Sequence, residues 1–558
     1  MNACLPFCRR QLLLIAALLL SLSACGRNTP ETDSAISAYS DEGPFEPAYG
    51  DALIYGVSGR PSILIPMLAG DSLSHEVAGQ IFNGLVKYDT DLTLMGDLAE
   101  SWGISPDGLE ITFHLKQSVL WADGTPFTAE DVMFGYKTII DEKTPTAYKE
   151  DYLQVRTAEV LDQYTFRVTY EKPFAPALSS WGSLVVLPRH LLEGKDITKV
   201  DFGRNPVGLG PYKLVKWDEG AQLDLVSNQD YFQGRPYIDR ITYRIIPDPA
   251  TQFLELKTGG VDFTSLSPLQ YTRQTDTDFF KNNFRKFRYP VFSYTYLGFN
   301  GKFPWFQDIR VRKAFAHAID KGEIIDAVLF GLGRPATGPF VPNTWPYNPD
   351  VPAYRFDPEK ARQLLAESGW TDSDGDGVVD RKGGTERFEF TILSNMGNDL
   401  RERTAVIIQQ RLKDVGIKAN LKFLEWSTFI NEFIDKRRFQ AVILGWSIGL
   451  DPDQYDIWHS SKLGPKEFNF VSYSNPEVDR LLDEGRRTFD MEERKKAYFR
   501  IQEILAEELP YIFLYVPDAL PIVHARFKGI DATPIGITYN QEKWFVPKEL
   551  QRYSSMDR

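Results

Sequence analysis

The sequence predicts a mixed α/β protein with at least two large lobes. Its 558 residues exceed what one hydrophobic core supports, since cores stop growing near ~250 to 300 residues. Strand-like and helix-like stretches alternate without a fixed period, which excludes a repeat solenoid and an all-helical bundle. With 43% apolar and 25% charged residues, the composition is that of a folded globular protein.

The N-terminal segment has the features of a cleaved export signal. Arg9 and Arg10 precede an apolar run at 12–20, which is too short for a bilayer span of about 20 residues. The sequence Leu-Ser-Ala-Cys at 22–25 resembles a bacterial lipobox, in which the cysteine is lipidated and becomes the first mature residue. A plain secretory signal cut nearby is the alternative. We expect a signal peptide at 1–24 and a lipidated, flexible tether at 25–47.

The cysteine content argues against an intrachain disulfide, and the net charge argues against nucleic acid as a binding partner. Cys4 and Cys8 leave with the signal, so Cys25 alone remains and no intrachain disulfide forms. The formal net charge of −13 argues against nucleic acid, whose binding requires a basic surface. We expect a monomer in the cell envelope, held at the membrane by its N-terminal lipid and facing the periplasm or the exterior.

The first half of the chain predicts short strands around one clear helix. Alternation at 111–115 indicates a strand, and Asp-Gly pairs nearby supply turns. Thr128 and Asp131 form an approximate capping box that begins a helix. The stretches 210–217 and 222–226 predict a hairpin, and 241–246 another strand.

The second half predicts a separate α/β unit that begins near Tyr294. A strand at 294–300 is followed by helical spacing of apolar residues from Asp308 to Leu329. Further helices are predicted at 358–366, 399–415, 428–435, 476–489 and 492–509.

Several spaced segments together resemble family 5 of the bacterial extracellular solute-binding proteins, the dipeptide-, oligopeptide- and nickel-binding group. They run in family order between about 50 and 525. The segments are 98–102 (LAESW), 112–116 (TFHLK), 121–132 (WADGTPFTAEDV), 208–212 (GLGPY), 308–314 (DIRVRKA), 318–320 (AID), 357–361 (DPEKA), 445–447 (GWS) and 451–453 (DPD).

This resemblance implies a two-lobed periplasmic-binding-protein-like fold of type II with an extra inserted domain and a ligand cleft between the lobes. Lobe I would comprise 48–82, 206–293 and 520–558, the inserted domain 83–205, and lobe II 294–519. It also implies a substrate-binding lipoprotein that delivers peptides to an ABC permease, without a catalytic step. An oligosaccharide, an opine or a metal chelate is the alternative ligand.

The resemblance also selects candidate ligand contacts, namely Trp446, Trp426, Tyr296 and Asn300. In peptide binders of this family a tryptophan matching Trp446 lies beside the ligand. An acidic residue three positions later holds the peptide's α-ammonium group, but here that position is Gly449. Asp451 and Asp453 are the nearest acids, and a loop that caps the following helix is their alternative role.

A serine hydrolase is the rival prediction from another class. Residues 445–449 match the G-x-S-x-G nucleophile elbow, with Ser447 as nucleophile after a strand-like stretch. The helix that must follow is not indicated, because Pro452 favours an extended residue before it. His459 is an available base, but nothing in the sequence places it near Ser447.

An acidic loop follows the rule of a calcium-binding loop. Asp372, Asp374 and Asp376 take positions one, three and five, and glycine takes position six. Val378 would contribute its carbonyl and Asp380 would take position nine. Position twelve is glycine instead of glutamate, so the loop would bind weakly or borrow Glu386. The alternatives are a structural Ca²⁺ and an acidic surface turn; no other cofactor is expected.

Overall fold

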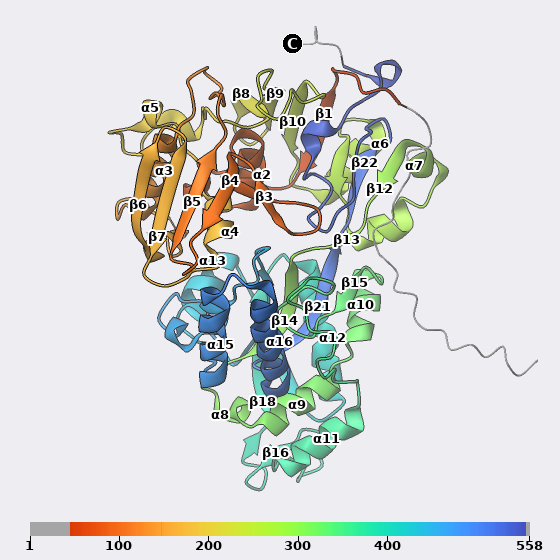
Figure 1. Ribbon diagram of the computed structural model, residues 1–558. Helices are drawn as coiled ribbons and strands as arrows, with labels where there is room; N and C mark the ends of the chain where they lie inside the picture. The colour runs from red at the N-terminus through yellow and green to blue at the C-terminus, as the bar shows by residue number, and fades with distance from the viewer. Residues whose placement is uncertain (1–44, 147, 554–558) are drawn as a thin grey trace, which may run out of the picture.

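The computed structural model describes residues 45–146 and 148–553, which form two lobes (Figure 1). The predicted signal peptide, most of the tether and Cys25 lie outside the described residues. Within the described part, no helix is both long and apolar enough to cross a bilayer.

Lobe I is built on a mixed seven-stranded sheet whose strands come from distant parts of the chain. Central β1 pairs in parallel with β10 and β11, and the outer pairs are antiparallel. The order is β12 (Phe284–Lys286), β22 (Pro521–His524), β11 (Phe263–Ser265), β1 (Ala52–Val57), β10 (Arg240–Ile245), β9 (Gln222–Ser227) and β8 (Tyr212–Asp218). The predicted hairpin is β8–β9, and the predicted strand at 241–246 is β10.

The inserted domain carries a four-stranded antiparallel sheet and a small hairpin. The sheet runs β4 (Ala99–Ile104), β5 (Glu110–Leu115), β7 (Thr165–Tyr170) and β6 (Val155–Asp162), and the hairpin is β2 (Val86–Tyr88) with β3 (Leu94–Gly96). One hydrophobic cluster joins Leu53 and Tyr243 of lobe I to Phe113 and Trp181 of the inserted domain. These two parts therefore form one body.

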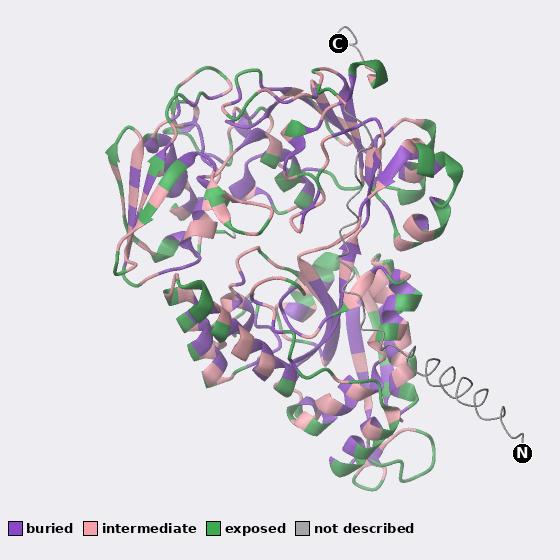
Figure 2. Ribbon diagram, turned by 45° about the vertical axis from the view of Figure 1, so that its right-hand side comes forward, coloured by how far each residue is buried: buried purple, intermediate pink, exposed green. Residues whose placement is uncertain are grey.

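Lobe II has its own seven-stranded mixed sheet, between two hydrophobic clusters. Along the sheet the order is β13 (Tyr289–Pro290), β21 (Tyr511–Ala519), β14 (Ser293–Phe299), β20 (Ala441–Ser447), β18 (Glu389–Asn395) and β19 (Lys418–Leu424), with β15 (Gly333–Pro335) beside β21. Figure 2 shows these strands buried along most of their length, with exposed helix faces outside.

Helices cover the sheets. They are α2 (Ser72–Ile81), α3 (Ala129–Ile140), α4 (Ala177–Ser183), α5 (Arg189–Leu192), α6 (Pro249–Thr258), α7 (Asp278–Asn283), α8 (Pro304–Gln307), α9 (Ile309–Ala318), α10 (Lys321–Leu329), α11 (Pro358–Glu367), α12 (Asp399–Lys413), α13 (Trp426–Thr428), α14 (Tyr455–Trp458), α15 (Pro476–Arg487) and α16 (Met491–Glu508).

Helix ends follow local chemistry. The predicted capping box of Thr128 and Asp131 is confirmed at the start of α3. The prediction of one continuous helix from Asp308 to Leu329 is wrong, because the chain leaves the helix at Ile319. Asp320 then caps a second helix by accepting a hydrogen bond from the backbone N–H of Glu323.

The lobes are joined where β13 and β21 cross from one to the other (Figure 1). Tyr289 of β13 pairs with Ala519, and Pro290 pairs with Asp518, at the end of β21. β13 lies inside the range predicted for lobe I but hydrogen-bonds within the lobe II sheet. The crossing strands therefore connect lobe I directly to the central sheet of lobe II.

Candidate functional site

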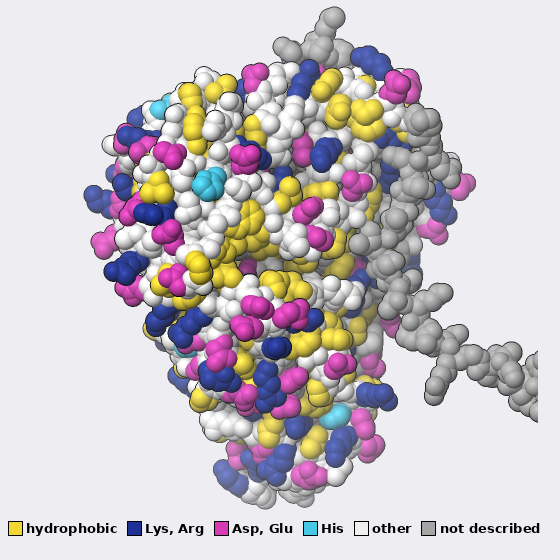
Figure 3. Space-filling model, in the orientation of Figure 1, with side chains coloured by type: hydrophobic (Ala, Val, Ile, Leu, Met, Phe, Trp, Pro, Cys, Tyr) yellow, Lys and Arg dark blue, Asp and Glu magenta, His cyan; other side chains and the backbone are white. Residues whose placement is uncertain are grey.

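A cavity of about 1030 Å³ opens where the lobes meet. Figure 3 shows hydrophobic side chains gathered on both sides of this boundary. The lining comes from inserted-domain residues 86–89, 94–95, 179 and 182–183, lobe I residues 49, 233–235, 237, 535, 539–540 and 542–543, and Leu450 of lobe II. A ligand held here touches both lobes.

The charged lining of this cavity carries both signs. Lys87, Arg235 and Lys543 are basic, whereas Asp89 and Glu542 are acidic. Aromatic rings add to it: the Arg235 guanidinium lies 4.5 Å from the ring centroid of Tyr49. The wall thus carries three basic and two acidic side chains, and its net charge does not favour a cation.

Trp446, the main predicted ligand contact, is half-buried near the end of β20. Its indole N–H donates to the Tyr511 hydroxyl at 3.3 Å, and its ring lies 5.4 Å from that of Phe468. In the register of the sheet it stands opposite Tyr294 of β14. These contacts fix one edge of the indole and leave part of the side chain exposed.

Tyr296 and Asn300 lie inside lobe II. The Tyr296 side chain is fully buried and stacks on Tyr511, with ring centroids 3.8 Å apart. The Asn300 amide donates to the carbonyls of Arg437 and Phe439. In this conformation both residues pack within lobe II. Trp426, by contrast, is 52% exposed at the start of α13.

Asp451 is held in a bidentate ion pair with Arg494 of α16. The contacts are 2.8 and 3.0 Å, and both side chains are largely buried. Such forked pairs are among the stronger hydrogen-bonded contacts in proteins. The carboxylate that the sequence offers to a ligand ammonium is therefore already neutralised within lobe II.

Asp453 is also held in an ion pair within lobe II. Its carboxylate forms an ion pair with Arg486, at 2.9 Å from the Nε, and accepts a hydrogen bond from the backbone N–H of Tyr455 at 3.1 Å. Burial raises the pKa of Asp453 to about 7, and the Arg486 charge acts in the opposite direction. The structure thus gives both predicted aspartates an ion-pairing role. Their contact with a ligand stays a prediction.

Arg486 also reaches across to the inserted domain. It lies 3.5 Å from the Asp151 carboxylate, and its guanidinium stands 5.1 Å from the ring centroid of Phe174. The backbone N–H of Ala175 donates to the Arg486 carbonyl at 2.7 Å. We call these contacts of Arg486 with Asp151, Phe174 and Ala175 the interlobe latch.

A second contact between the lobes is apolar. Leu92, in the turn between β2 and β3, lies in a small pocket with Phe292, Phe340 and Ile448 of lobe II. Its backbone has φ of +67°, a left-handed conformation that is unfavourable for leucine. The turn therefore holds an unusual conformation at the contact with lobe II.

Ser447 does not form a nucleophile elbow. β20 ends at Ser447, and the next helix begins only at Tyr455, so the sharp strand-to-helix turn of that motif is missing here. The imidazole of His459 is hydrogen-bonded to the Ser461 hydroxyl at 2.8 Å and stacks on Tyr455.

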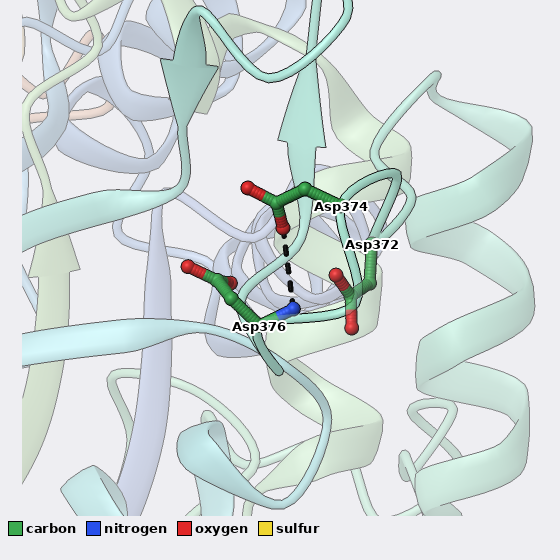
Figure 4. A group of neighbouring side chains, drawn as sticks. All are labelled: Asp372, Asp374 and Asp376. Atoms are coloured by element: carbon green, nitrogen blue, oxygen red, sulfur yellow. Dashed lines mark hydrogen bonds between the residues drawn. The ribbon is translucent and has the colours of Figure 1, made fainter.

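The acidic loop brings together three of its predicted ligands. Carboxylate oxygens of Asp372, Asp374 and Asp376 lie within 4.8 Å of one another (Figure 4). Asp380 is turned away, because its carboxylate accepts from Ser373 and from the backbone N–H of Gly384.

Two of the predicted calcium ligands of this loop, Glu386 and Asp376, also form ion pairs with nearby basic residues. Glu386, the borrowed ligand, accepts from the Trp305 indole and pairs with Lys382. Arg387 pairs with Asp376 at 2.5 Å. The backbone N–H of Val378 donates to Asp376 at 2.9 Å, and the ligand role of its carbonyl stays a prediction.

Comparison with known proteins identifies the family to which this chain belongs. The model of "Bacterial extracellular solute-binding proteins, family 5 Middle" matches residues 93–467, about two thirds of the chain. The chain belongs to this family. The resemblance inferred from spaced motifs is confirmed, as is the two-lobed fold.

Three family 5 proteins illustrate the range of similarity. The oligopeptide-binding protein AppA of Bacillus subtilis is 33% identical over 96% of this chain and 98% of its own length. The AppA structure in complex with a nonapeptide has a TM-score of 0.77 at 32% identity, covering 90% of this chain and all of AppA.

The other two are solved complexes. NikZ of Campylobacter jejuni with Ni(L-His) has a TM-score of 0.78 at 28% identity, covering 89% of this chain and 99% of NikZ. DppA of Helicobacter pylori with the peptide STSA has a TM-score of 0.75 at 27% identity, covering 90% of this chain and 99% of DppA.

Sequence reasoning missed the basic partners and the interlobe contacts of this family 5 protein. Arg486 and Arg494 sit on helices α15 and α16, where they read as ordinary solvated charges. Their partners are more than 30 residues away in sequence, so no local spacing signals the pairs. Leu92 gives no signal at all, since a single leucine in a hairpin turn is unremarkable.

Proposed function

We propose that this protein captures peptides outside the cytoplasm and passes them to an ABC importer. The observation that carries the proposal is the cavity of about 1030 Å³ bounded by lobe I, the inserted domain and Leu450. That volume is at the upper end of the range for small-ligand pockets, which suits a ligand of several residues. Two family relatives have been solved with peptides bound, a nonapeptide and STSA.

Capture follows from closure of the lobes. A ligand that touches both lobes favours the closed arrangement over the open one, because only the closed arrangement provides both sets of contacts. The interlobe latch and Leu92 add protein contacts that exist only when the inserted domain meets lobe II. No bond is made or broken, so the protein acts without a catalytic step.

A metal chelate is the second candidate ligand. NikZ, which is as similar in fold as AppA, was solved with Ni(L-His). The mixed charges of the cavity wall suit a polar chelate as well as a peptide.

Anchoring at the membrane is part of the same proposal. Lipid on Cys25 would tether the lobes near the permease through the segment at 25–47. Incorporation of labelled palmitate into the wild-type protein, and its loss in Cys25→Ser, is the expected result. Release of the unmodified wild-type protein into the medium would contradict anchoring.

A structural Ca²⁺ at the acidic loop is also proposed. The mutual approach of three carboxylates supports it, and hard oxygen ligands suit Ca²⁺. Its role would be to stabilise the loop between α11 and β18, away from the cleft.

Mass spectrometry of molecules released from natively purified protein tests the transport proposal. We expect peptides of a narrow length range. Recovery of a chelate or a sugar would overturn the peptide assignment and keep the capture role. Solution scattering that shows no compaction with any retained molecule would contradict capture itself.

A further inference from the structure

Two carboxylates share one guanidinium where the inserted domain meets lobe II. Arg486 Nε lies 2.9 Å from the Asp453 carboxylate of its own lobe, and Arg486 Nη2 lies 3.5 Å from the Asp151 carboxylate across the boundary. The guanidinium stands 4.2 Å from the ring centroid of Tyr455 and 5.1 Å from that of Phe174. One positive charge therefore serves two negative charges between aromatic rings from both lobes.

Closure of the lobes creates this imbalance. Asp453 and Arg486 belong to lobe II, so in an open arrangement they remain a balanced pair and Asp151 of the inserted domain stays in water. When the lobes meet, Asp151 loses part of its water and approaches a second carboxylate. Burial raises the pKa of Asp151 and that of Asp453, the latter to about 7, and the Asp151 charge adds to the shift at Asp453. The closed arrangement therefore holds a proton more tightly than the open one.

Asp151 offers a place for that proton. Its Oδ2 lies 2.5 Å from the Ser180 hydroxyl oxygen, which also lies 3.1 Å from the carbonyl oxygen of Pro176. A hydroxyl has one hydrogen to donate, so with Asp151 ionised it serves only one of these two acceptors. With Asp151 protonated, the carboxyl O–H donates to Ser180 and the Ser180 hydroxyl donates to Pro176. Protonation thus satisfies both contacts.

Both oxygens of Asp453 already face donors. One accepts a hydrogen bond from the backbone N–H of Tyr455 at 3.1 Å, and the other lies 2.9 Å from Arg486 Nε. Donors that face a carboxylate favour its ionised form. The proton that the two acids share therefore belongs on Asp151, whose side chain is 35% exposed and so exchanges protons with solvent.

Other charged groups around the junction come in balanced sets. In lobe II they pair among themselves: Asp451 with Arg494, Asp456 and Glu467 with Lys462, and Asp483 with Arg487. On the inserted domain two acids and two bases line a separate cavity of about 650 Å³ beside the interlobe latch, namely Glu150, Glu171, Arg156 and Lys172. The charges of Asp456 and Asp451 still raise the pKa of Asp151. Together these groups do not supply the positive charge that the two acids at Arg486 lack.

We propose that Asp151 takes up a proton when the lobes close and releases it when they open. This inference rests on the proposed closure and adds a proton to it. The closed arrangement gains population as the pH falls, because it binds the proton more tightly. The gain is complete below the pKa of Asp151 in the open arrangement and is lost as the pH rises through its higher pKa in the closed one. Mild acid outside the cell therefore strengthens capture.

The test compares peptide retention at pH 5.5 and at pH 8. A tryptic digest of casein is offered below saturation to wild type and to Asp151→Asn, whose amide is neutral at both pH values and donates to Ser180 as the protonated acid does. We expect wild type to retain about fivefold more peptide at pH 5.5 than at pH 8. Asp151→Asn should retain at both pH values as much as wild type does at pH 5.5. Asp326→Asn, a change at an exposed aspartate on α10, should behave as wild type.

A second variant keeps the test valid if Asp151→Asn misfolds. Asp453→Asn leaves Asp151 the whole charge of Arg486, so Asp151 stays ionised and the pH dependence should again disappear. Urea midpoints check that both variants fold. Histidines change charge between pH 5 and 8, and His459 stacks on Tyr455 beside the interlobe latch. A pH dependence that is kept in Asp151→Asn and lost in His459→Gln would overturn the proposal.

The outcomes separate proton uptake from peptide capture. If wild type retains peptides equally at both pH values, or if Asp151→Asn keeps the wild-type dependence, capture stands and proton uptake is overturned. If wild type retains no peptide at either pH, peptide capture fails, and solution scattering of the ligand-free protein decides proton uptake. A smaller radius of gyration at pH 5.5 than at pH 8 that is absent in Asp151→Asn supports it, and the same radius at both pH values overturns it.

Discussion

The two lobes hold acidic side chains in opposite states. In lobe II, Asp451 and Asp453 are neutralised by Arg494 and Arg486 from neighbouring helices. In lobe I, Glu76 makes no hydrogen bond or ion pair with any described residue. Paired carboxylates fix the architecture and cannot bind a ligand cation without first losing a partner, whereas an unpaired carboxylate makes the free protein less stable and is available for binding.

The largest effect is expected from breaking the lobe II pair. Arg494→Met leaves Asp451 largely buried without its partner, which costs about 3 to 5 kcal/mol. Urea unfolding followed by tryptophan fluorescence should show a lower midpoint for lobe II, where Trp345 and Trp458 report. An unchanged midpoint would mean that solvent reaches Asp451 in the folded protein.

A matched exposed pair provides the control. Arg480 and Glu484 form an i,i+4 pair on α15 with both side chains more than half exposed. Arg480→Met should change stability by less than about 0.5 kcal/mol. A large loss of stability in Arg480→Met would show that α15 is sensitive to any arginine replacement.

The second effect concerns the interlobe latch. Arg486→Met removes the ion pair with Asp151 and the contact with Phe174, so the closed arrangement should lose about 1 to 2 kcal/mol relative to the open one. It also removes the partner of Asp453, which lowers the stability of lobe II in both arrangements. Solution scattering of the ligand-free protein should report a larger radius of gyration. Arg487→Met is the control, because within residues 45–146 and 148–553 the Arg487 guanidinium pairs only with Asp483 on its own helix. If Arg486→Met and Arg487→Met have the same radius of gyration, the interlobe latch does not stabilise the closed arrangement.

Much of the fold was predictable because its signals are local. The Thr128–Asp131 capping box, the β8–β9 hairpin and the family motifs each lie within a few residues, where spacing determines structure. The break at Ile319 was missed since apolar spacing continues through it. Only the cap at Asp320 marks the new helix.

The site was less predictable because it depends on contacts between distant segments. Sequence reasoning identified Asp451 and Asp453 but not their partners, which lie 43 and 33 residues further along. Glu76 also escaped notice: on α2 it has the spacing of an ordinary solvated residue. That Glu76 makes no hydrogen bond or ion pair with any described residue becomes visible only in the folded structure.

The acidic loop extends the comparison to carboxylates outside the cleft. If Asp372, Asp374 and Asp376 bind Ca²⁺, the ion should stabilise the protein by about 1.4 kcal/mol at a free concentration ten times the Kd. Thermal unfolding in calcium and in a chelator should differ for wild type. Asp374→Asn should abolish that difference, while Asp380→Asn, which alters a hydrogen-bonding carboxylate outside the cluster, should lower stability in both buffers. If calcium still raises the unfolding temperature of Asp374→Asn, this loop is not the calcium-binding site.

The smallest effect is the pH dependence that Glu76 gives to the ligand-free protein. Because the folded-state pKa is about 7 and the usual value is 4.5, the folded protein holds this proton more tightly than the unfolded chain. The stability that Glu76 contributes is therefore complete below about pH 4.5 and falls as the pH rises to 7. Glu76→Gln lacks this fall, so it should match wild type at pH 5 and be more stable at pH 8. The gain should stay under about 1 kcal/mol, since solvent screens an exposed side chain. Urea midpoints at the two pH values measure it, and a wild type that is more stable than Glu76→Gln at pH 8 would show that the protein itself compensates the charge.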